Sequence, residues 1–195
     1  RKSFRIIDRD GNTVQRREWL SEQSPDAAEK GEFAHYMLKE IHEQPRAVAQ
    51  TLEERVAGGK LLEAAFGPAA QAVFAKTEAV RIVACGTSFH AATVAKYFIE
   101  QICRLPCWVE IASEYRYRNP VVPKNTLFVS VSQSGETADT LAALRLAKGA
   151  GYLSQLAICN VPESSLVRES ELVMLTRAGP EIGVASTKAF TTQLA

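Results

Sequence analysis

The sequence predicts an α/β protein built on a doubly wound, five-stranded parallel sheet. From about residue 81 onwards, short apolar segments alternate with longer segments of helical periodicity, the pattern of strands joined by helical crossovers. The apolar segments carry few polar residues, as expected of strands that are buried on both faces of a parallel sheet. They cover residues 81–84, 107–111, 126–131, 155–159 and 172–175. For such a domain we expect the flavodoxin-like strand order 2-1-3-4-5.

The segments between these strand candidates have the residue spacing of helices. Residues 89–103 place Ala91, Val94, Ala95, Phe98 and Ile102 on one stripe. Further helices are expected at residues 111–117, 136–148 and 188–194. Together these segments supply the helical layers that a doubly wound sheet needs on its faces.

The beginning of the chain lacks this alternation. Residues 4–8 predict a short strand and residues 10–12 a turn, and polar sequence continues through Ser24-Pro25-Asp26. A helix is predicted over residues 30–43, stopped by Pro45, and a second helix follows until Gly58-Gly59.

These segments divide the chain into three parts. We expect a linker over residues 1–29, a helical arm over residues 30–78 and the α/β unit over residues 79–195. A chain of 195 residues is long enough for one domain of ordinary size with such an extension.

Composition excludes several classes of protein. The formal net charge of +1 leaves no basic surface for nucleic acid, and no apolar stretch approaches the roughly 20 residues of a membrane span. Arg1 is not followed by a long apolar core, so we expect no signal peptide. The cysteines form no CxxC pair and no zinc-ligand pattern with histidine. We therefore expect reduced thiols, no metal, and a cytoplasmic location.

Two strand-to-helix turns are rich in hydroxyl side chains. The first is Cys85-Gly86-Thr87-Ser88, after the first strand candidate, and the second is Ser132-Gln133-Ser134-Gly135-Glu136-Thr137, after the third. Strands 1 and 3 are neighbours in the expected order, so both turns should face one crevice where the order reverses. Helix N-termini and neutral donors suit a phosphate group. A third loop, residues 178–188, either closes over such a ligand or is a plain connection.

Other interpretations of these residues remain open at this stage. A single Ser or Thr before a helix is most often an N-cap, and Glu136 is explained as an acid in the first turn of a helix. The first turn lacks the second and third glycines of a dinucleotide-binding GxGxxG motif. Cys85 as a nucleophile would have only His90 as a nearby base. Lys188 is better explained as a surface lysine than as a Schiff-base lysine.

The order of the motifs resembles one enzyme family closely. Residues 84–88, 132–140 and 181–191 closely resemble the glutamine–fructose-6-phosphate aminotransferase family, and residues 36–45 and 110–118 look like the same enzymes. The resemblance covers nearly the whole chain. It implies the fold of a sugar isomerase (SIS) subdomain and an enzyme that makes glucosamine 6-phosphate and glutamate from fructose 6-phosphate and glutamine.

The resemblance also implies where the ligand sits. The implied substrate-binding residues are Cys85, Gly86, Thr87, Ser88, Ser132, Gln133, Ser134 and Thr137 around the phosphate and Val184, Ala185 and Ser186 beside the sugar. The expected ligand is fructose 6-phosphate or glucosamine 6-phosphate, and no cofactor is implied. In the family the reactive lysine, glutamate and histidine lie in a second SIS subdomain, which here would follow Ala195.

The resemblance therefore predicts a fragment: a linker from a missing glutaminase domain, the arm and the first SIS subdomain. Such a piece should bind its sugar phosphate without turning it over, and the family's pairing of subunits predicts a homodimer. Two alternatives stay open. One is a stand-alone phosphosugar-binding SIS sensor, although residues 1–80 carry no basic recognition helix. The other is a small sugar-phosphate isomerase, which would need a base in the crevice.

Overall fold

The computed structural model describes residues 4–16 and 29–195. Its centre is a sheet of five parallel strands, β3 (Ala79–Ala84), β4 (Cys107–Ile111), β5 (Thr126–Ser132), β6 (Ser154–Cys159) and β7 (Leu172–Leu175). They lie in the order β4-β3-β5-β6-β7, which is the predicted order 2-1-3-4-5. The predicted fold class is confirmed.

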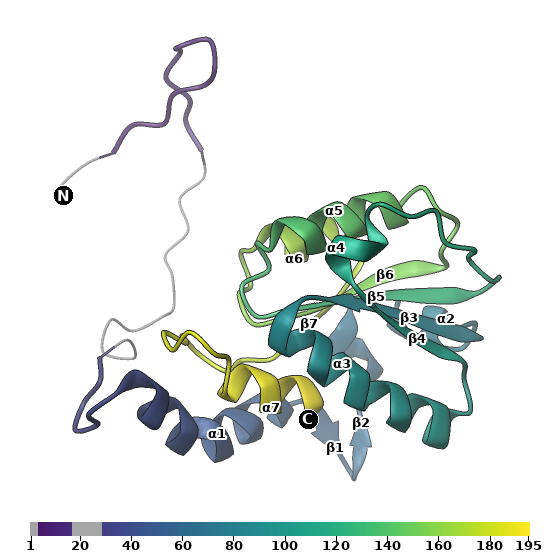
Figure 1. The fold of residues 1–195 in the computed structure, drawn as a ribbon, viewed down its shortest axis with the longest axis horizontal. Helices are drawn as coiled ribbons and strands as arrows, with labels where there is room; N and C mark the ends of the chain where they lie inside the picture. The colour runs from purple at the N-terminus through teal and green to yellow at the C-terminus, as the bar shows by residue number, and fades with distance from the viewer. Residues whose placement is uncertain (1–3, 17–28) are drawn as a thin grey trace.

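Helices cover both faces of this sheet (Figure 1). One face carries α4 (Ala112–Tyr115), α5 (Ala138–Ala147) and α6 (Ser165–Glu169). The other carries α2 (Ala70–Phe74), α3 (Gly86–Phe98) and the π-helical turn η3 (Ile99–Cys103). The helix predicted over residues 89–103 thus begins three residues earlier, so the hydroxyl side chains after β3 lie in its first turn.

A separate hydrophobic core lies on each face. Tyr115, Phe128, Leu144 and Leu166 are fully buried on the side of α4, α5 and α6. The second core lies between the opposite face of the strands and helices α2 and α3, and it includes Ile82. Burying a large apolar side chain contributes about 1.5–3 kcal/mol. These two layers therefore fix the strand ends on which the site is built.

The helical arm differs from its prediction at Pro45. The structure has one continuous helix, α1 (Tyr36–Leu52), which contains Pro45, where two helices were predicted. A proline inside a helix lacks the N–H that would bond the carbonyl four residues earlier. Here that carbonyl belongs to Ile41, and the Gln44 side chain donates to it at 3.0 Å. A neighbouring side chain thus replaces the missing main-chain hydrogen bond.

The arm also contains a hairpin that was not predicted. Its two strands, β1 (Val56–Ala57) and β2 (Lys60–Leu61), are antiparallel and joined by Gly58 and Gly59. Both glycines have positive φ values, 59° and 74°, as the favoured two-residue hairpin turns require. The glycines that were expected to end a helix therefore form a turn between strands, and the short 3₁₀ helix η2 (Glu63–Phe66) follows.

The C-terminal end of the chain agrees with its prediction, and at the N-terminal end the predicted strand over residues 4–8 is reduced to a single bridge. Ile7 and Thr13 form an antiparallel bridge around the predicted turn, although most of the predicted linker, residues 1–3 and 17–28, lies outside the described residues. Helix α7 (Lys188–Leu194) occupies the predicted span and lies beside α1 and α3 (Figure 1). Within the described ranges, no helix has the length and apolarity to cross a membrane.

Candidate functional site

The two hydroxyl-rich turns lie at one edge of the sheet. Ala84 of β3 pairs with Val131 of β5 in parallel register, so both strands end at the same level and the two turns that follow them leave the same edge of the sheet. A cavity of about 290 Å³ opens between them. Its lining comprises Cys85, Gly86, Thr87, Ser88, Val131, Ser132, Gln133, Ser134, Thr137, Thr140, Val184 and Ser186. The predicted crevice is present, and Ala185 alone among the predicted residues does not line it.

Two lining residues were missed by sequence reasoning. Val131 belongs to the strand itself, and its apolar character marks it as core. Thr140 follows Thr137 by three residues on α5, a spacing that puts both on one helix face, so that spacing was the available signal. Thr140 is only 1% exposed, and its hydroxyl oxygen has no hydrogen-bond partner among the described residues.

Three serine hydroxyls around the cavity accept hydrogen bonds from N–H groups. Ser132 Oγ accepts from the Gly135 amide at 3.0 Å, and Ser134 Oγ accepts from the Glu136 amide at 3.2 Å. Ser88 Oγ accepts from Gln193 Nε2 at 3.0 Å. A hydroxyl that accepts in this way keeps its own hydrogen for a further acceptor. The cavity wall therefore presents donors, which suits a group made only of acceptor oxygens.

The helices that point at the cavity have no side-chain caps. The N-cap residues are Cys85 for α3 and Thr137 for α5, and neither side chain accepts a bond from the first turn. The interpretation of these turns as ordinary N-caps is therefore wrong. Uncapped first-turn amides and the positive end of each helix dipole favour an anion nearby.

The lining contains no lysine, arginine, histidine or carboxylate. Cys85 is its one titratable side chain, and no hydrogen bond joins Cys85 to His90 in the described structure. A cavity of this composition can hold an anion through neutral dipoles. It offers no positioned base for proton transfer.

Gly135 allows the second turn to pass close to the neighbouring strand and helix. Its φ of +67° lies in the left-handed region, and an added Cβ would lie 2.2 Å from Ser164 Oγ and 2.8 Å from Cys159 Sγ. Neither the backbone conformation nor the space admits a side chain. The glycine thus fixes the path of the turn that carries Ser132 and Ser134.

Glu136 has a different role from the one predicted. Helix α5 begins at Ala138, and the Glu136 carboxylate instead accepts a hydrogen bond from the Ser165 amide at 2.7 Å. This main-chain bond, together with the Ser165 hydroxyl, lowers the pKa of Glu136 below its ordinary value. Its carboxylate therefore stays ionised and holds the start of α6 against the second turn.

The third loop reaches the cavity through Val184 and Ser186, so it is more than a plain connection. The prediction that Lys188, at its end, is a surface lysine is wrong. Lys188 is 3% exposed, and its Nζ donates to Glu43 Oε2 at 2.6 Å. This ion pair joins α7 to α1, and Lys188 does not line the cavity.

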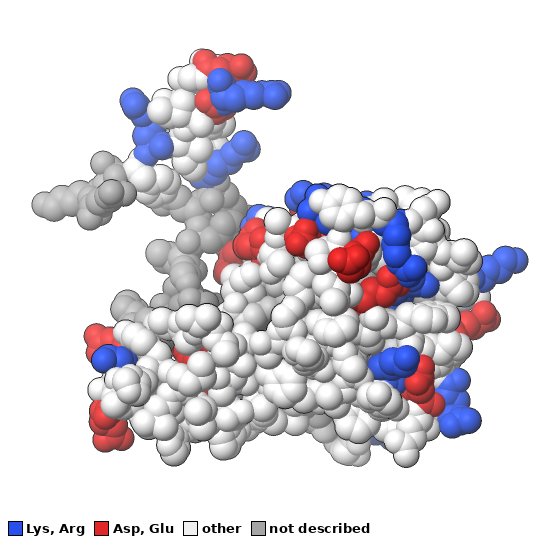
Figure 2. Space-filling view, viewed as in Figure 1, with Lys and Arg blue, Asp and Glu red and all other residues white. Residues whose placement is uncertain are grey.

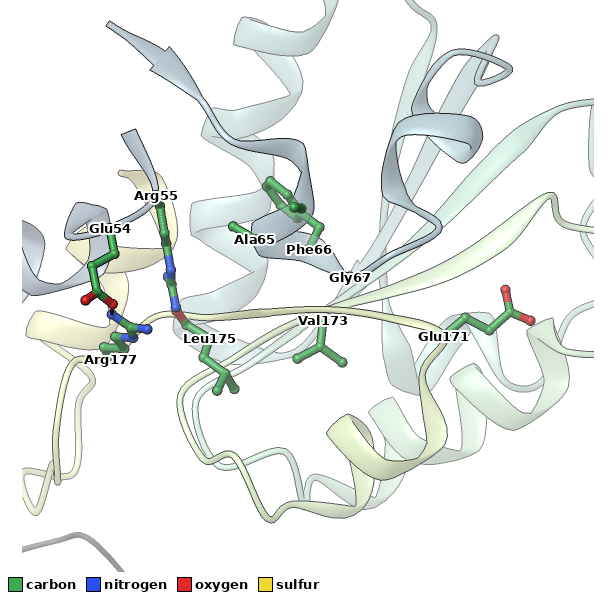
Figure 3. A pocket seen from close by; sticks show the side chains of 10 residues that line it. Glu54, Arg55, Ala65, Phe66, Gly67, Glu171, Val173, Leu175 and Arg177 are labelled. Carbon is green, nitrogen blue, oxygen red and sulfur yellow. Dashed lines mark hydrogen bonds and ion pairs between the residues drawn. The ribbon is translucent and has the colours of Figure 1, made fainter. Parts of the chain in front are cut away.

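A larger cavity, of about 500 Å³, lies along the edge strand β7, between it and residues 54–67 (Figure 3). Arg55 and Arg177 lie on its wall, and their side chains are already engaged. Arg55 Nη1 donates to the Thr51 and Leu175 carbonyls, and Arg177 forms an ion pair with Glu54 at 3.8 Å. None of the predicted site residues lines this cavity.

No group of three or more His, Cys, Asp or Glu side chains that could hold a metal ion occurs in the part of the chain that the structure describes.

Comparison with known proteins agrees with the motifs. Over 194 residues the chain is 60% identical to glutamine–fructose-6-phosphate aminotransferase (isomerizing) from Pseudomonas aeruginosa, covering 100% of this chain and 32% of that protein. It is 54% identical to the Escherichia coli (strain K12) protein of the same name, with the same coverage. The chain thus spans about a third of the length of the curated relatives it matches.

A solved structure is similar over most of the chain. The C-terminal domain of glucosamine-fructose-6-phosphate aminotransferase from Francisella tularensis matches 86% of this chain and 47% of that chain, with a TM-score of 0.83 and 57% identity. The SIS domain family matches residues 74–195. The resemblance predicted from the motifs is therefore confirmed, and the chain belongs to the SIS domain family.

Proposed function

We propose that the cavity between α3 and α5 binds fructose 6-phosphate or glucosamine 6-phosphate. The observation that carries this proposal is the convergence of two uncapped helix N-termini and three donor serines on a cavity without fixed charge. A phosphate group has only acceptor oxygens and a negative charge, so it matches both features. The phosphate would lie between residues 85–88 and 132–137, with the sugar toward Val184, Ala185 and Ser186.

The chain is proposed to serve an enzyme that makes glucosamine 6-phosphate and glutamate from fructose 6-phosphate and glutamine. The names of its similar proteins support this activity. The cavity lining has no carboxylate, histidine or lysine to act as a base, so the chemistry would need residues from outside this chain. This lack of a base also weighs against a small, self-sufficient isomerase. We accordingly propose residues 79–195 as the sugar-phosphate-binding unit, residues 30–78 as its arm and residues 1–29 as a linker to a glutaminase domain.

We also propose that the protein forms a homodimer in the cytoplasm. Figure 2 shows few charged side chains over the middle of the face formed by α1, α7 and α3. On α3 and η3, Tyr97 is 64% exposed and Ile102 is 74% exposed, and apolar surface of this kind marks protein contacts. All four cysteines are free thiols, as in a reducing compartment.

Titration of the isotopically labelled chain tests ligand binding. Fructose 6-phosphate should shift the amide signals of residues 85–88 and 132–137 in two-dimensional NMR spectra. Glucose, which lacks the phosphate, should leave them unchanged at equal concentration. If millimolar fructose 6-phosphate perturbs neither turn, the proposed site is wrong.

A further inference from the structure

A buried carboxylate of the arm contacts the third loop far from it in sequence. Glu40 of α1 is 3% exposed, and its Oε1 accepts hydrogen bonds from the Ile182 amide at 2.6 Å and the Gly183 amide at 3.0 Å. An added Cβ on Gly183 would lie 2.5 Å from Glu40 Oε2. The carboxylate therefore fits against bare main chain, directly before the residues that reach the cavity.

The same face of α1 holds the other end of the loop. Met37 Sδ accepts a hydrogen bond from Thr187 Oγ1 at 3.0 Å, and Glu43 pairs with Lys188. Met37, Glu40 and Glu43 are spaced three residues apart, so they lie along one side of the helix. Both ends of residues 182–187 are thus fastened to α1, and Val184 and Ser186 lie between the two attachments.

Stability alone does not explain a carboxylate at position 40. Burial of an ionised carboxylate is costly unless its oxygens are well satisfied. Glu40 Oε2 is buried without a hydrogen-bond partner among the described residues. An apolar side chain of similar volume would avoid this cost, but it could not bind two main-chain amides. The arrangement favours a fixed loop position over maximal stability.

We propose that Glu40 is a positioning residue for the sugar end of the cavity. It holds the amides of Ile182 and Gly183 so that Val184 and Ser186 stay against the bound sugar. The inference rests on the proposed binding of a hexose 6-phosphate. It adds that the arm, which does not line the cavity, determines how tightly the sugar part of the ligand is held.

Two ligands separate this role from a general effect on folding. Inorganic phosphate should contact the two turns alone, whereas fructose 6-phosphate should contact the turns and the loop. In calorimetric titrations of the whole chain, Glu40→Ala should weaken fructose 6-phosphate binding about tenfold, the equivalent of about 1.4 kcal/mol. Phosphate binding should stay within about twofold of wild type, since about 0.4 kcal/mol or less is then lost.

A conservative variant and a matched control complete the test. Glu40→Gln keeps an oxygen acceptor and should recover most of the fructose 6-phosphate affinity. Glu110→Ala breaks the ion pairs of Glu110 with the buried Arg81 and with Arg118; it should lower thermal stability and leave the ratio of the two affinities unchanged. Hydrogen exchange of the Ile182 and Gly183 amides should be faster in Glu40→Ala and unchanged in Glu110→Ala.

Each contrary result is distinct. Equal affinities of wild type and Glu40→Ala for fructose 6-phosphate would overturn the positioning role, as would an equal loss for both ligands. If Glu40→Ala does not fold, Glu40→Gln alone decides. Unchanged hydrogen exchange of the Ile182 and Gly183 amides, together with a large loss of phosphate binding in this variant, would also overturn the positioning role. Failure of the proposed function differs from all of these: the wild-type chain would bind neither ligand, and the positioning role for a sugar phosphate would fall with it.

Discussion

Ser134 occupies the second turn with its hydroxyl oxygen bonded to the Glu136 amide, which leaves its hydrogen for a ligand. Ser134→Ala should therefore weaken fructose 6-phosphate binding by about 1.5–3 kcal/mol, the range for a hydrogen bond to a charged group. Isothermal titration measures the change. Ser113→Ala, in α4 and outside the cavity lining, is the control. Equal losses in the two variants would contradict the assignment of the turn.

Gly135 and Gly151 allow a comparison of two effects of an added methyl group. Both have positive φ, but only at Gly135 would a Cβ meet neighbouring atoms, whereas Gly151 has open space. Gly151→Ala should lower the free energy of unfolding by about 1–2 kcal/mol from the backbone alone. Gly135→Ala should lose that amount and roughly 1–3 kcal/mol more from overpacking. Chemical denaturation measures both, and similar losses would show that the turn relaxes without strain.

Sequence reasoning located most of the cavity lining, because the pattern that marks those residues is local. Thr87, Ser132 and Ser134 were recognisable because hydroxyl side chains stood directly after apolar strands. Lys188 and Glu136 were misjudged because their partners are distant in sequence: Glu43 precedes Lys188 by 145 residues, and Ser165 follows Glu136 by 29. A local pattern contains no information about such partners, so it cannot show whether a charged residue is buried.

At the level of elements, we expect Gln44 to support α1 at Pro45 through its bond to the Ile41 carbonyl. Gln44→Ala should remove the bond to the Ile41 carbonyl and lower the free energy of unfolding by about 0.5–1.5 kcal/mol. In a Pro45→Ala background the restored main-chain N–H can reach that carbonyl, so the same substitution should cost much less. A double-mutant cycle measured by denaturation gives the coupling. Additive effects would mean that Gln44 does not compensate for the proline.

The strands were more predictable than the arm for a physical reason. Strands of a parallel sheet are short and mostly apolar, and β4 and β7 have their predicted bounds even though they are the edge strands and only partly buried. In the arm, Pro45 and the Gly58-Gly59 pair are ambiguous, because each permits more than one local structure. The outcome there depended on a side-chain bond from Gln44 and on the pairing of β1 with β2, and neither is visible in hydrophobic spacing.

At the scale of the whole molecule, the exposed apolar face should mediate self-association. Sedimentation velocity at tens of micromolar should show a dimer for the wild-type chain. Ile102→Glu should shift the protein toward monomer, because a buried charge at the contact is costly. Val121→Glu changes an apolar residue that is at least as exposed and lies outside α3 and η3, and it serves as the control. A wild-type monomer throughout this range would contradict the proposed homodimer.

The chain by itself should bind fructose 6-phosphate without converting it. Its cavity has no base, and the Lys188 amine is held by Glu43. Incubation with fructose 6-phosphate should give no glucose 6-phosphate, and added glutamine or ammonia should give no glucosamine 6-phosphate. Glu181 of the third loop, whose Oε1 accepts from the Thr187 amide at 2.6 Å, is the one carboxylate in that loop. Turnover that disappears in Lys188→Ala or Glu181→Gln would locate the chemistry in this chain.

The neutral lining of the cavity also determines how binding responds to solvent. With no fixed cation in the lining, the protein contributes no strong salt-screened attraction of the kind that charged sites exert over about 10 Å. The main group that titrates near neutral pH is then the phosphate of the ligand, because a phosphate monoester gains its second negative charge near pH 6. Affinity would rise through that range as the dianion forms, and its pH profile would report the ionisation of the ligand instead of a side chain.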